Sequence, residues 1–449
     1  MNYVWIIALV LGLLGHPASA QQLRSGPMVG YSDLREVALW VQTDGPCRVA
    51  FRYWPQGDKS QARTSPAVDT KSEGAYTATV ALEGLEPGTR YVYELLINRR
   101  TVRRTYPLEF QTQALWMHRT DPPAFRFAAG SCNFTNDPPY DRPGRGYGGG
   151  DSIFSTIHSF RPDFMVWLGD NIYLREVDWN SRSGIYYRYT HSRSVPELQP
   201  LLGSCHHYAI WDDHDYGPND SDRGYLRKRD AWDAFRDFWA NPTVGIDGPY
   251  NGTTTQFAWG DCEFFLLDNR WFRSPNKRRS GRCTILGKKQ LSWLVDALVS
   301  SKATFKFICI GGQVLNPAEV HETYANLCPD ERSQLLRLIK RERVSGVVFL
   351  DGDRHTTELS RLDDADFYPL HDLTVSPLTS GVPGPQAEQE ANTLRVPGTF
   401  VRERNFALIE VSGPYKNRVL TLNIVGIDGS TRWTRQIRAS ELQAPKAKP

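Results

Sequence analysis

Four apolar segments of this chain each lead into side chains that can bind a metal ion or transfer a proton. Such runs are typical of buried strands, and open α/β folds build their sites at the carboxyl ends of strands. The segments and the groups that follow them are residues 162–168 with Asp170 and Tyr173, residues 127–131 with Cys132, residues 208–211 with Asp212, Asp213, His214 and Asp215, and residues 347–350 with Asp353 and His355. Carboxylate, thiolate, phenolate and imidazole groups at one sheet edge would form a site for more than one metal ion.

Each of these segments also has a simpler interpretation. An Asp after a strand is usually a helix cap or a turn residue, and a Cys such as Cys132 is often a buried apolar thiol or half of a disulfide. Residues 213–220 could form a calcium loop of the EF-hand type, but the sixth position of that loop requires Gly and here it is Pro218. Four such segments in one chain favour the metal site over these separate interpretations.

Taken in order, the segments resemble the alkaline phosphatase D (PhoD-like) branch of the calcineurin-type metallophosphoesterases. The resemblance covers about residues 125–411. Three departures from the common superfamily pattern mark the branch: Cys132 stands in the first motif, Tyr173 replaces the last Asp of the second, and Asp353 replaces a His of the final one. The resemblance implies an α/β metallophosphatase sandwich, in which mixed β-sheets are flanked by helices.

The residue types suggest how one cation of a pair would be bound. One carboxylate can join two cations, so Asp170 suits a bridging ligand. Cys132 and Tyr173 are anionic donors that would stabilise a highly charged ion such as Fe³⁺. The resemblance implies iron in this position, with His355 as a further candidate ligand.

The second cation position is less completely specified by the sequence. Asp213 and Asp353 offer oxygen donors, which suit a harder divalent ion, and the resemblance implies Ca²⁺. Asp212 is either a further ligand or a hydrogen-bond acceptor. The fourth superfamily motif, a lone His after a strand, is not evident in residues 311–317, which occupy its place. Either Gln313 or Asn316 serves instead, or the position has one ligand fewer.

Three further residues are candidates for a direct part in the reaction. His214 aligns with the superfamily histidine that contacts the phosphoryl oxygen, and a histidine can stabilise developing charge or protonate a leaving alkoxide. Asp215 would then orient or polarise His214. Arg354, between two candidate ligands, would either clamp a phosphate oxygen or point away as a surface charge.

The N-terminus and the charge bear on where the protein works and what it binds. Residues 4–14 are apolar and are followed by Ala18-Ser19-Ala20, the pattern of a secretory signal peptide, which we assign to residues 1–20. We therefore expect a secreted or periplasmic protein that uses the general secretion route. The net charge of +3 is too small to indicate a nucleic-acid or stable membrane partner, and the sequence does not fix the oligomeric state.

A chain of 449 residues is too long for one ordinary core, so we expect two domains after processing. Residues 21–118 alternate as half-buried strands do, and residues 82–95 resemble the turn and tyrosine corner of fibronectin type III sandwiches. This part is expected to be an all-β domain of the fibronectin III or immunoglobulin-like class. After a linker at Asp121-Pro122-Pro123, strands and helices interleave over residues 124–437, which we assign to the catalytic domain.

The candidate ligands all lie after this linker. We therefore expect a fragment that starts near Thr120 to fold without the first domain and to bind its metals, because interfaces between domains are often modest and polar. Residues 438–449 are expected to form a flexible tail. Of the seven cysteines, Cys283 and Cys328 lie in polar, loop-like surroundings and are the best candidates for a disulfide.

The sequence leads to one principal functional hypothesis and two alternatives. The principal hypothesis is a secreted, metal-dependent phosphoric-ester hydrolase that acts on a small phosphorylated substrate. The preference for phosphomonoesters or phosphodiesters is open, and the family includes enzymes with phosphodiesterase or phospholipase D-like action. The alternative from another class is a non-catalytic, calcium-dependent binding or adhesion protein in which the carboxylates are structural.

Overall fold

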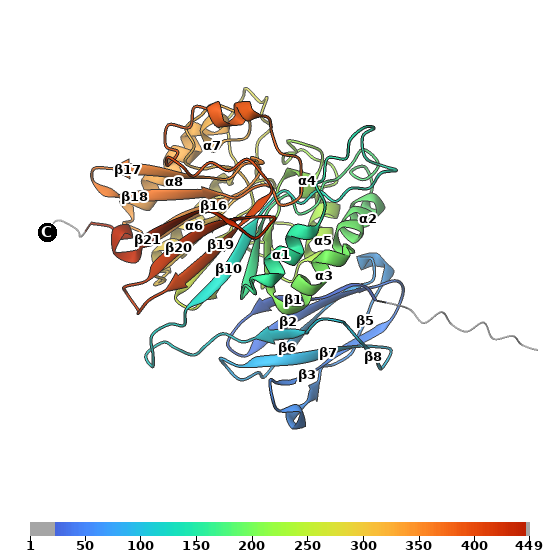
Figure 1. The fold of residues 1–449 in the computed structure, drawn as a ribbon. Coiled ribbons are helices and arrows are strands. Elements are labelled where there is room, and N and C mark those ends of the chain that lie inside the picture. Colours follow the sequence, from blue (N-terminus) through green and yellow to red (C-terminus); the bar gives the residue numbers. More distant parts are fainter. Residues whose placement is uncertain (1–22, 446–449) are drawn as a thin grey trace, which may run out of the picture.

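The computed structural model describes residues 23–445 (Figure 1). The predicted signal peptide therefore lies outside the described residues. Two large β-sheets pack face to face, helices cover their outer faces, and a smaller third sheet lies beside the first strands of the chain. Among residues 23–445, no helix is long and apolar enough to cross a membrane.

The first large sheet has nine strands and combines the start, middle and end of the described chain. Its order is β21 (Thr431–Arg438), β20 (Val419–Gly426), β19 (Asn405–Ser412), β10 (Phe125–Gly130), β11 (Phe164–Leu168), β12 (His206–Ile210), β1 (Leu23–Ser32), β2 (Glu36–Thr43) and β6 (Thr77–Glu83). Strands β10, β11 and β12 are parallel neighbours. They are buried almost throughout, which explains why their sequences are continuous apolar runs.

The second large sheet has six strands. Its order is β13 (Thr255–Trp259), β14 (Cys262–Leu266), β15 (Phe305–Cys309), β16 (Val347–Asp351), β18 (Phe367–Thr374) and β17 (Glu358–Asp364). Aromatic rings fill the space between the two sheets: Phe127 stacks on Phe164 at 4.8 Å between ring centroids and meets Phe264 edge-on at 5.2 Å. These contacts fix the two sheets against each other.

Helices cover the sheets on both sides. Buried residues of α1 (Ser152–Ser159), α2 (Arg182–Arg193), α3 (Gln199–Ser204) and α5 (Lys228–Phe238) form one apolar cluster with the first sheet. Residues of α6 (Gly287–Ser300) and α8 (Pro329–Arg341) join the cluster of the second sheet. The remaining α-helices, α4 (Asp213–Tyr216) and α7 (Tyr324–Leu327), have one turn each. The structure thus has the alternating strands and helices that the sequence predicts for the second part of the chain.

The third sheet contains β3 (Arg48–Pro55), β4 (Arg63–Thr64), β5 (Val68–Asp69), β7 (Arg90–Ile97), β8 (Arg100–Val102) and β9 (Glu109–Gln111). The predicted tyrosine corner is present, because the hydroxyl oxygen of the fully buried Tyr91 accepts the backbone N–H of Glu86 at 2.9 Å. Among residues 23–111, the structure contains strands, loops and two short 3₁₀ helices, but no α-helix. Its assignment to the fibronectin type III class stays a prediction.

The two parts of the chain share a sheet, which the sequence did not predict. Strand β1 pairs in parallel with β12, so the nine-stranded sheet continues from the second part into the first. Along β2 the side chains alternate between two cores: Val37, Leu39 and Val41 face the third sheet, whereas Ala38 and Trp40 pack with the helices of the second part. The expectation of a modest, polar interface is therefore wrong.

The prediction of a flexible tail is also wrong for residues 438–445, the part of the tail that the structure describes. Strand β21 ends at Arg438 and is followed by a 3₁₀ helix, η5 (Ala439–Leu442). Leu442 is fully buried, and its carbonyl oxygen accepts the backbone N–H of Gly346 at 2.8 Å. The backbone N–H of Ala444 donates to Ser345 Oγ at 3.0 Å. An apolar residue near the end of the chain therefore completes the core of the second sheet.

The shared sheet changes what is expected of a fragment that starts at Thr120. Such a fragment would expose the edge of β12 and the apolar surface that Trp40 covers, so we expect it to aggregate or to remain unfolded. Size-exclusion chromatography and far-ultraviolet circular dichroism would measure this. A monomeric, folded fragment with the unfolding temperature of the whole chain would contradict the structure.

A single substitution tests the same interface. Trp40 is fully buried, packs at 5.8 Å from the ring of Phe238, and donates from Nε1 to the carbonyl oxygen of Asp237 at 2.8 Å. We expect Trp40→Ala to lower the free energy of unfolding by about 3–5 kcal/mol, as for other large core residues. Val68→Ala in the exposed strand β5 is the control and should change it by less than about 0.5 kcal/mol.

Candidate metal centre

The predicted strand ends meet at one edge of the two sheets. Cys132 follows β10, Asp170 follows β11, Asp213 begins α4 after β12, and Asp353 follows β16. The Sγ atom of Cys132 lies 3.7 Å from Asp170 Oδ2, and the backbone N–H of His214 donates to Asp170 Oδ1 at 3.3 Å. The structure thus brings the candidate ligands of four separate segments together around Asp170.

The backbone at these strand ends is strained. Cys132, Asp170, Asp353 and His355 have φ angles of 62°, 52°, 68° and 55°, in the left-handed region that residues other than Gly rarely adopt. Each such residue costs of the order of 1–3 kcal/mol, and strain of this kind gathers at functional sites. Gly169, just before Asp170, has a φ of 91°, and a Cβ atom there would lie 2.7 Å from that of Asp212. The tight turns direct several polar side chains into one small volume.

The first potential cation position combines four kinds of donor. The Sγ of Cys132, a carboxylate oxygen of Asp170 and a ring nitrogen of His355 lie within 4.8 Å of one another. The Tyr173 hydroxyl lies 3.0 Å from His355 Nε2. The other ring nitrogen, Nδ1, lies 2.8 Å from the carbonyl oxygen of Gly381, which leaves Nε2 for a cation. The structure thus brings together the four side chains that the sequence predicts for the first metal position.

The second potential position is built mainly from carboxylate oxygens and shares Asp170 with the first. Donor atoms of Asp170, Asp213 and His214 lie within 4.8 Å of one another, and so do those of Asp212, Asp213 and Asp353. Asp212 Oδ2 and Asp213 Oδ1 are buried without a hydrogen-bond partner. Buried polar atoms are almost always paired, so Asp212 Oδ2 fits a cation, whereas Asp213 Oδ1 lies 3.7 Å from Nη2 of the buried Arg270.

The pKa shifts of the acidic side chains also indicate that the site binds cations. Burial, followed by the nearby Asp213 and Cys132, raises the pKa of Asp170 well above its ordinary value. Burial together with Glu322 and two aspartates does the same to the pKa of Asp353. Burial and the carboxylate of Asp170 also raise the pKa of Tyr173 well above its usual value. Cations between these groups would relieve the repulsion and allow them to ionise. The residues therefore fit a pair of bound metal ions.

Comparison with known proteins identifies the family. A family profile described as PhoD-like phosphatase matches residues 127–410. The chain belongs to the PhoD-like phosphatase family. A second profile, described as a domain of unknown function, matches residues 20–115.

Individual relatives of this PhoD-like protein agree with that placement. Alkaline phosphatase D of Bacillus subtilis is 23% identical over 337 residues, which cover 64% of this chain and 54% of the relative. The match thus spans about half of that relative's length. The solved structure described as "Structure of PhoD" has a TM-score of 0.76 at 18% identity and covers 96% of this chain and 93% of its own. A purple acid phosphatase from yellow lupin (Lupinus luteus) has a TM-score of 0.64 at 13% identity, with 92% and 74% covered. These likenesses establish a metallophosphatase-like fold.

The structure corrects the role expected for Asp215. Its buried carboxylate accepts the backbone N–H groups of Asn171 at 3.0 Å and Asp212 at 2.9 Å. His214 Nδ1 has no hydrogen-bond partner, so Asp215 does not orient the His214 ring through a hydrogen bond. That ring instead stacks on Tyr173 at 4.1 Å between centroids. Asp215 therefore holds the two ligand-bearing loops together, and Tyr173 positions His214.

Arg354 lies in the wall of the site and is not a surface charge. Its side chain is 8% exposed and forms an ion pair with Glu390, which accepts a second hydrogen bond from Asn316 Nδ2 at 2.8 Å. Arg354 and Glu390 both line the cavity above the candidate ligands. The role of Arg354 in clamping a phosphate stays a prediction.

Gln313 and Asn316, the residues considered for the missing fourth motif, are engaged elsewhere. Gln313 Nε2 donates to Glu358 Oε1 at 2.8 Å, and Asn316 Nδ2 donates to Gln313 Oε1 at 2.8 Å. The reason lies at Gly311, where a Cβ atom would come within 2.6 Å of the Asp212 carboxyl carbon. A side chain at position 311 would collide with Asp212, so this position cannot carry a ligand.

Two neighbouring side chains bind one carboxylate oxygen of Asp212. Asn269 Nδ2 donates to Asp212 Oδ1 at 2.7 Å, and the fully buried Arg270 forms an ion pair with the same carboxylate. Burial raises the pKa of Asp212 to about 6 although Arg270 opposes the shift. One oxygen of Asp212 therefore accepts hydrogen bonds, and the other is buried without a hydrogen-bond partner. A role of Asp212 as a metal ligand stays a prediction.

Sequence reasoning missed several residues of the site. A cavity of about 840 Å³ above the ligands is also lined by Tyr147, Asp220, Asn276, Glu322 and Glu390. The Tyr147 hydroxyl lies 3.0 Å from His355 Nδ1. The pKa of Asp220 rises to about 7, chiefly because its carboxyl hydrogen-bonds Glu322. None of these residues follows a strand directly, so the pattern of strand ends contains no signal for them.

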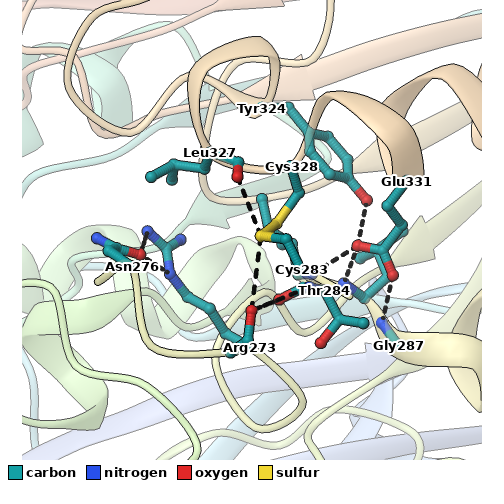
Figure 2. Close-up of a disulfide and its surroundings, with 12 residues drawn as sticks. Arg273, Asn276, Cys283, Thr284, Gly287, Tyr324, Leu327, Cys328 and Glu331 are labelled. Carbon is teal, nitrogen blue, oxygen red and sulfur yellow. Dashed lines mark hydrogen bonds between the residues drawn. A yellow bond between two sulfur atoms is a disulfide. The ribbon is translucent and has the colours of Figure 1, made fainter. Parts of the chain in front are cut away.

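The predicted disulfide is confirmed and braces one wall of the cavity. Cys283 and Cys328 are bonded, with their Cα atoms 5.3 Å apart (Figure 2). The bond joins the loop that carries Arg273 and Asn276 to the segment between α7 and α8. Beside it, Glu331 accepts the backbone N–H of Gly287 at 2.9 Å. Two loops that are far apart in sequence are thus fixed to each other next to the site.

The position of Asp215 leads to a test. Asp215→Ala would leave the buried N–H groups of Asn171 and Asp212 without an acceptor, at about 1–3 kcal/mol for each. We therefore expect the variant to lose stability in urea unfolding with chelator present, and Asp215→Asn, which keeps an acceptor oxygen, to lose less. Unchanged unfolding combined with reduced turnover would instead support the orienting role and contradict the structure.

Proposed function

We propose that this protein hydrolyses phosphoric esters with a pair of metal ions joined by Asp170. The observation that carries the proposal is the shared carboxylate: Asp170 belongs to the donor group with Cys132 and His355, and its carboxylate also lies within 4.8 Å of a carboxylate oxygen of Asp213. Two cations that share one carboxylate lie close enough together to bind both the attacking and the leaving oxygen of a phosphoryl group. The family membership and the metallophosphatase-like fold support the same reaction.

The residues divide into those that hold the cations and those that meet the ester. When bound, the cations would supply Lewis acidity and a nucleophile at neutral pH. His214 lines the cavity, and burial lowers its pKa, so its ring is neutral near pH 7 and can donate a hydrogen bond to a phosphoryl or leaving oxygen. Tyr173 fixes the plane of that ring by stacking on it. Arg354 lies in the cavity wall beside Glu390, where its guanidinium can donate a hydrogen bond to a phosphate oxygen.

The donor sets support different ions in the two positions. The thiol of Cys132, the phenol of Tyr173 and the imidazole of His355 suit Fe³⁺, whereas the carboxylates of Asp213 and Asp353 suit Ca²⁺. A purely structural calcium site would not need a thiol, a phenol and an imidazole at one point. This difference favours the hydrolase over the calcium-dependent binding protein.

The size of the cavity bears on the substrate. About 840 Å³ is within the range of pockets that hold drug-sized ligands and leaves room for a sizeable alcohol beside the phosphoryl group. We therefore propose that the possible substrates comprise phosphodiesters and phospholipase D-like substrates as well as phosphomonoesters. The signal-peptide pattern of residues 1–20 supports a secreted or periplasmic location.

Two substitutions separate metal binding from turnover. Asp170→Asn removes the charge that both cations share, so we expect it to lose metal and activity together. His214→Ala removes one contact to the ester, and we expect the metals to stay while turnover falls by about 10²–10⁴. Elemental analysis and hydrolysis of chromogenic mono- and diesters measure both effects. Full turnover of His214→Ala with its metals in place would exclude a catalytic role for His214.

The proposed iron position predicts a colour. A phenolate bound to ferric iron absorbs visible light by charge transfer, so we expect the purified protein to be coloured and Tyr173→Phe to shift or remove the band. Tyr147→Phe is the matched control, because the Tyr147 hydroxyl contacts His355 Nδ1 on the side away from the proposed cation, and the band should persist. A colourless, iron-free protein with full activity would refute iron in this position.

A further inference from the structure

The aromatic ring of Tyr147 lies beside the metal centre, next to His355. Its hydroxyl oxygen lies 3.0 Å from His355 Nδ1, and its ring packs edge-on against Phe134 at 4.9 Å between centroids. Gly381 makes room for the ring, because a Cβ atom at that position would lie 2.4 Å from Tyr147 Cε2. Tyr147 is nevertheless 46% exposed and lines the cavity. A large aromatic surface is thus held beside the candidate ligands and left open to the cavity.

The loop that carries Tyr147 is fixed by its own hydrogen bonds. Asn136 Nδ2 donates to the carbonyl oxygen of Gly148 at 3.0 Å, and Asn136 Oδ1 accepts the backbone N–H of Gly148 at 2.9 Å. The backbone N–H of Gly149 donates to the carbonyl oxygen of Thr379 at 2.7 Å. The protein itself therefore holds the ring in position, which lowers the entropic cost of a contact between the ring and a bound molecule.

The cavity wall continues beside Tyr147 with uncharged groups. Val382, Pro383 and Ala387 line the cavity and are partly exposed, and Gln386 adds one amide. Together with the ring of Tyr147 they form a surface that is mostly apolar. Such a surface can pack against the carbon skeleton of an alcohol.

The arginines that line the cavity are both paired. Arg354 forms an ion pair with Glu390, and both side chains line the cavity. Arg395 forms an ion pair with Glu358, and these two residues also line it. The described lining of the cavity contains no other arginine or lysine. An alcohol with a negative charge of its own would therefore meet no unpaired arginine or lysine side chain there.

The simpler interpretation is that Tyr147 only orients the ring of His355 through its hydroxyl group. That role does not need an exposed aromatic face, and His355 Nδ1 already lies 2.8 Å from the carbonyl oxygen of Gly381. We propose that Tyr147 and residues 381–387 bind the alcohol part of the phosphoric ester, and that this alcohol is uncharged and has an apolar face. The inference rests on the proposed function and names the class of substrate for the same site.

Turnover of matched esters by the whole protein tests the proposal. Methyl and phenyl esters are compared, as monoesters or as symmetric diesters, in whichever class the wild type hydrolyses. We expect Tyr147→Ala to lower kcat/KM at least about fivefold more for the phenyl ester than for the methyl ester, chiefly through KM, because the ring contact is lost. Tyr147→Phe keeps the ring and should retain the wild-type ratio of the two esters. Tyr140→Ala is the control with the same expected ratio, because Tyr140 is 45% exposed on the same loop and is not part of the cavity lining.

A charged ester tests the second part of the proposal. A 4-carboxyphenyl ester adds one negative charge to the same ring, so we expect its KM for the wild type to be at least about fivefold higher than that of the phenyl ester. An equal or lower KM would contradict the binding of an uncharged alcohol.

The outcomes distinguish the inference from the function on which it rests. If Tyr147→Ala lowers kcat/KM for the methyl and phenyl esters by the same factor, or loses metal in elemental analysis, Tyr147 acts only through His355 and the inference is wrong. If the wild type hydrolyses neither monoesters nor diesters, the proposed function is wrong as well. A changed ratio with wild-type metal content would support the inference.

Discussion

Repulsion between acidic groups that are buried together dominates this structure. Cys132, Asp170, Asp213 and Asp353 come from four strand ends. The first three are almost fully buried, and Asp353 lies beside Asp213 in the wall of the cavity. Burial and mutual repulsion raise the pKa values of Asp170 and Asp353 far above the ordinary range. Side chains in this arrangement either keep their protons or bind cations. Bound cations would therefore stabilise the fold as well as supply the chemistry.

The rest of the molecule can be understood as the support for that crowded volume. Two sheets joined by stacked phenylalanines hold the strand ends in place, and strained turns direct the ligands inward. Arg270 balances part of the negative charge through Asp212 and Glu322. Asp215 ties the loop after β11 to the loop after β12. The first part of the chain extends the same sheet and packs against the helices behind it.

The sequence predicted the site correctly where a ligand directly follows a strand that its own apolar pattern reveals. Continuous apolar runs such as residues 164–168 predicted parallel, buried strands, and the polar residues that follow them predicted the ligands, because strand ends meet at one edge. It was uninformative where the structure depends on contacts between distant segments. Alternation along β2 predicted a strand but could not show that Trp40 and Leu39 face two different cores. Similarly, Glu322 lies in a loop without periodicity, and only the path of that loop brings it to the site.

The misassigned role of Asp215 has a related cause. Adjacency to His214 suggested a partner for its ring, but residues next to each other in a one-turn helix point in different directions. The carboxylate therefore faces backbone N–H groups, while the ring faces Tyr173. Side-chain direction at a strand end depends on turn geometry, which the order of residues does not specify.

The central claim is that bound cations, held through Asp170, perform the hydrolysis. The most direct measurement is the metal content of the purified protein together with its turnover of a chromogenic phosphoric ester, before and after chelation and again after metals are restored. The account predicts stoichiometric metal, loss of turnover on chelation and recovery on reconstitution with iron and calcium. Undiminished turnover by protein from which all metal has been removed would contradict it.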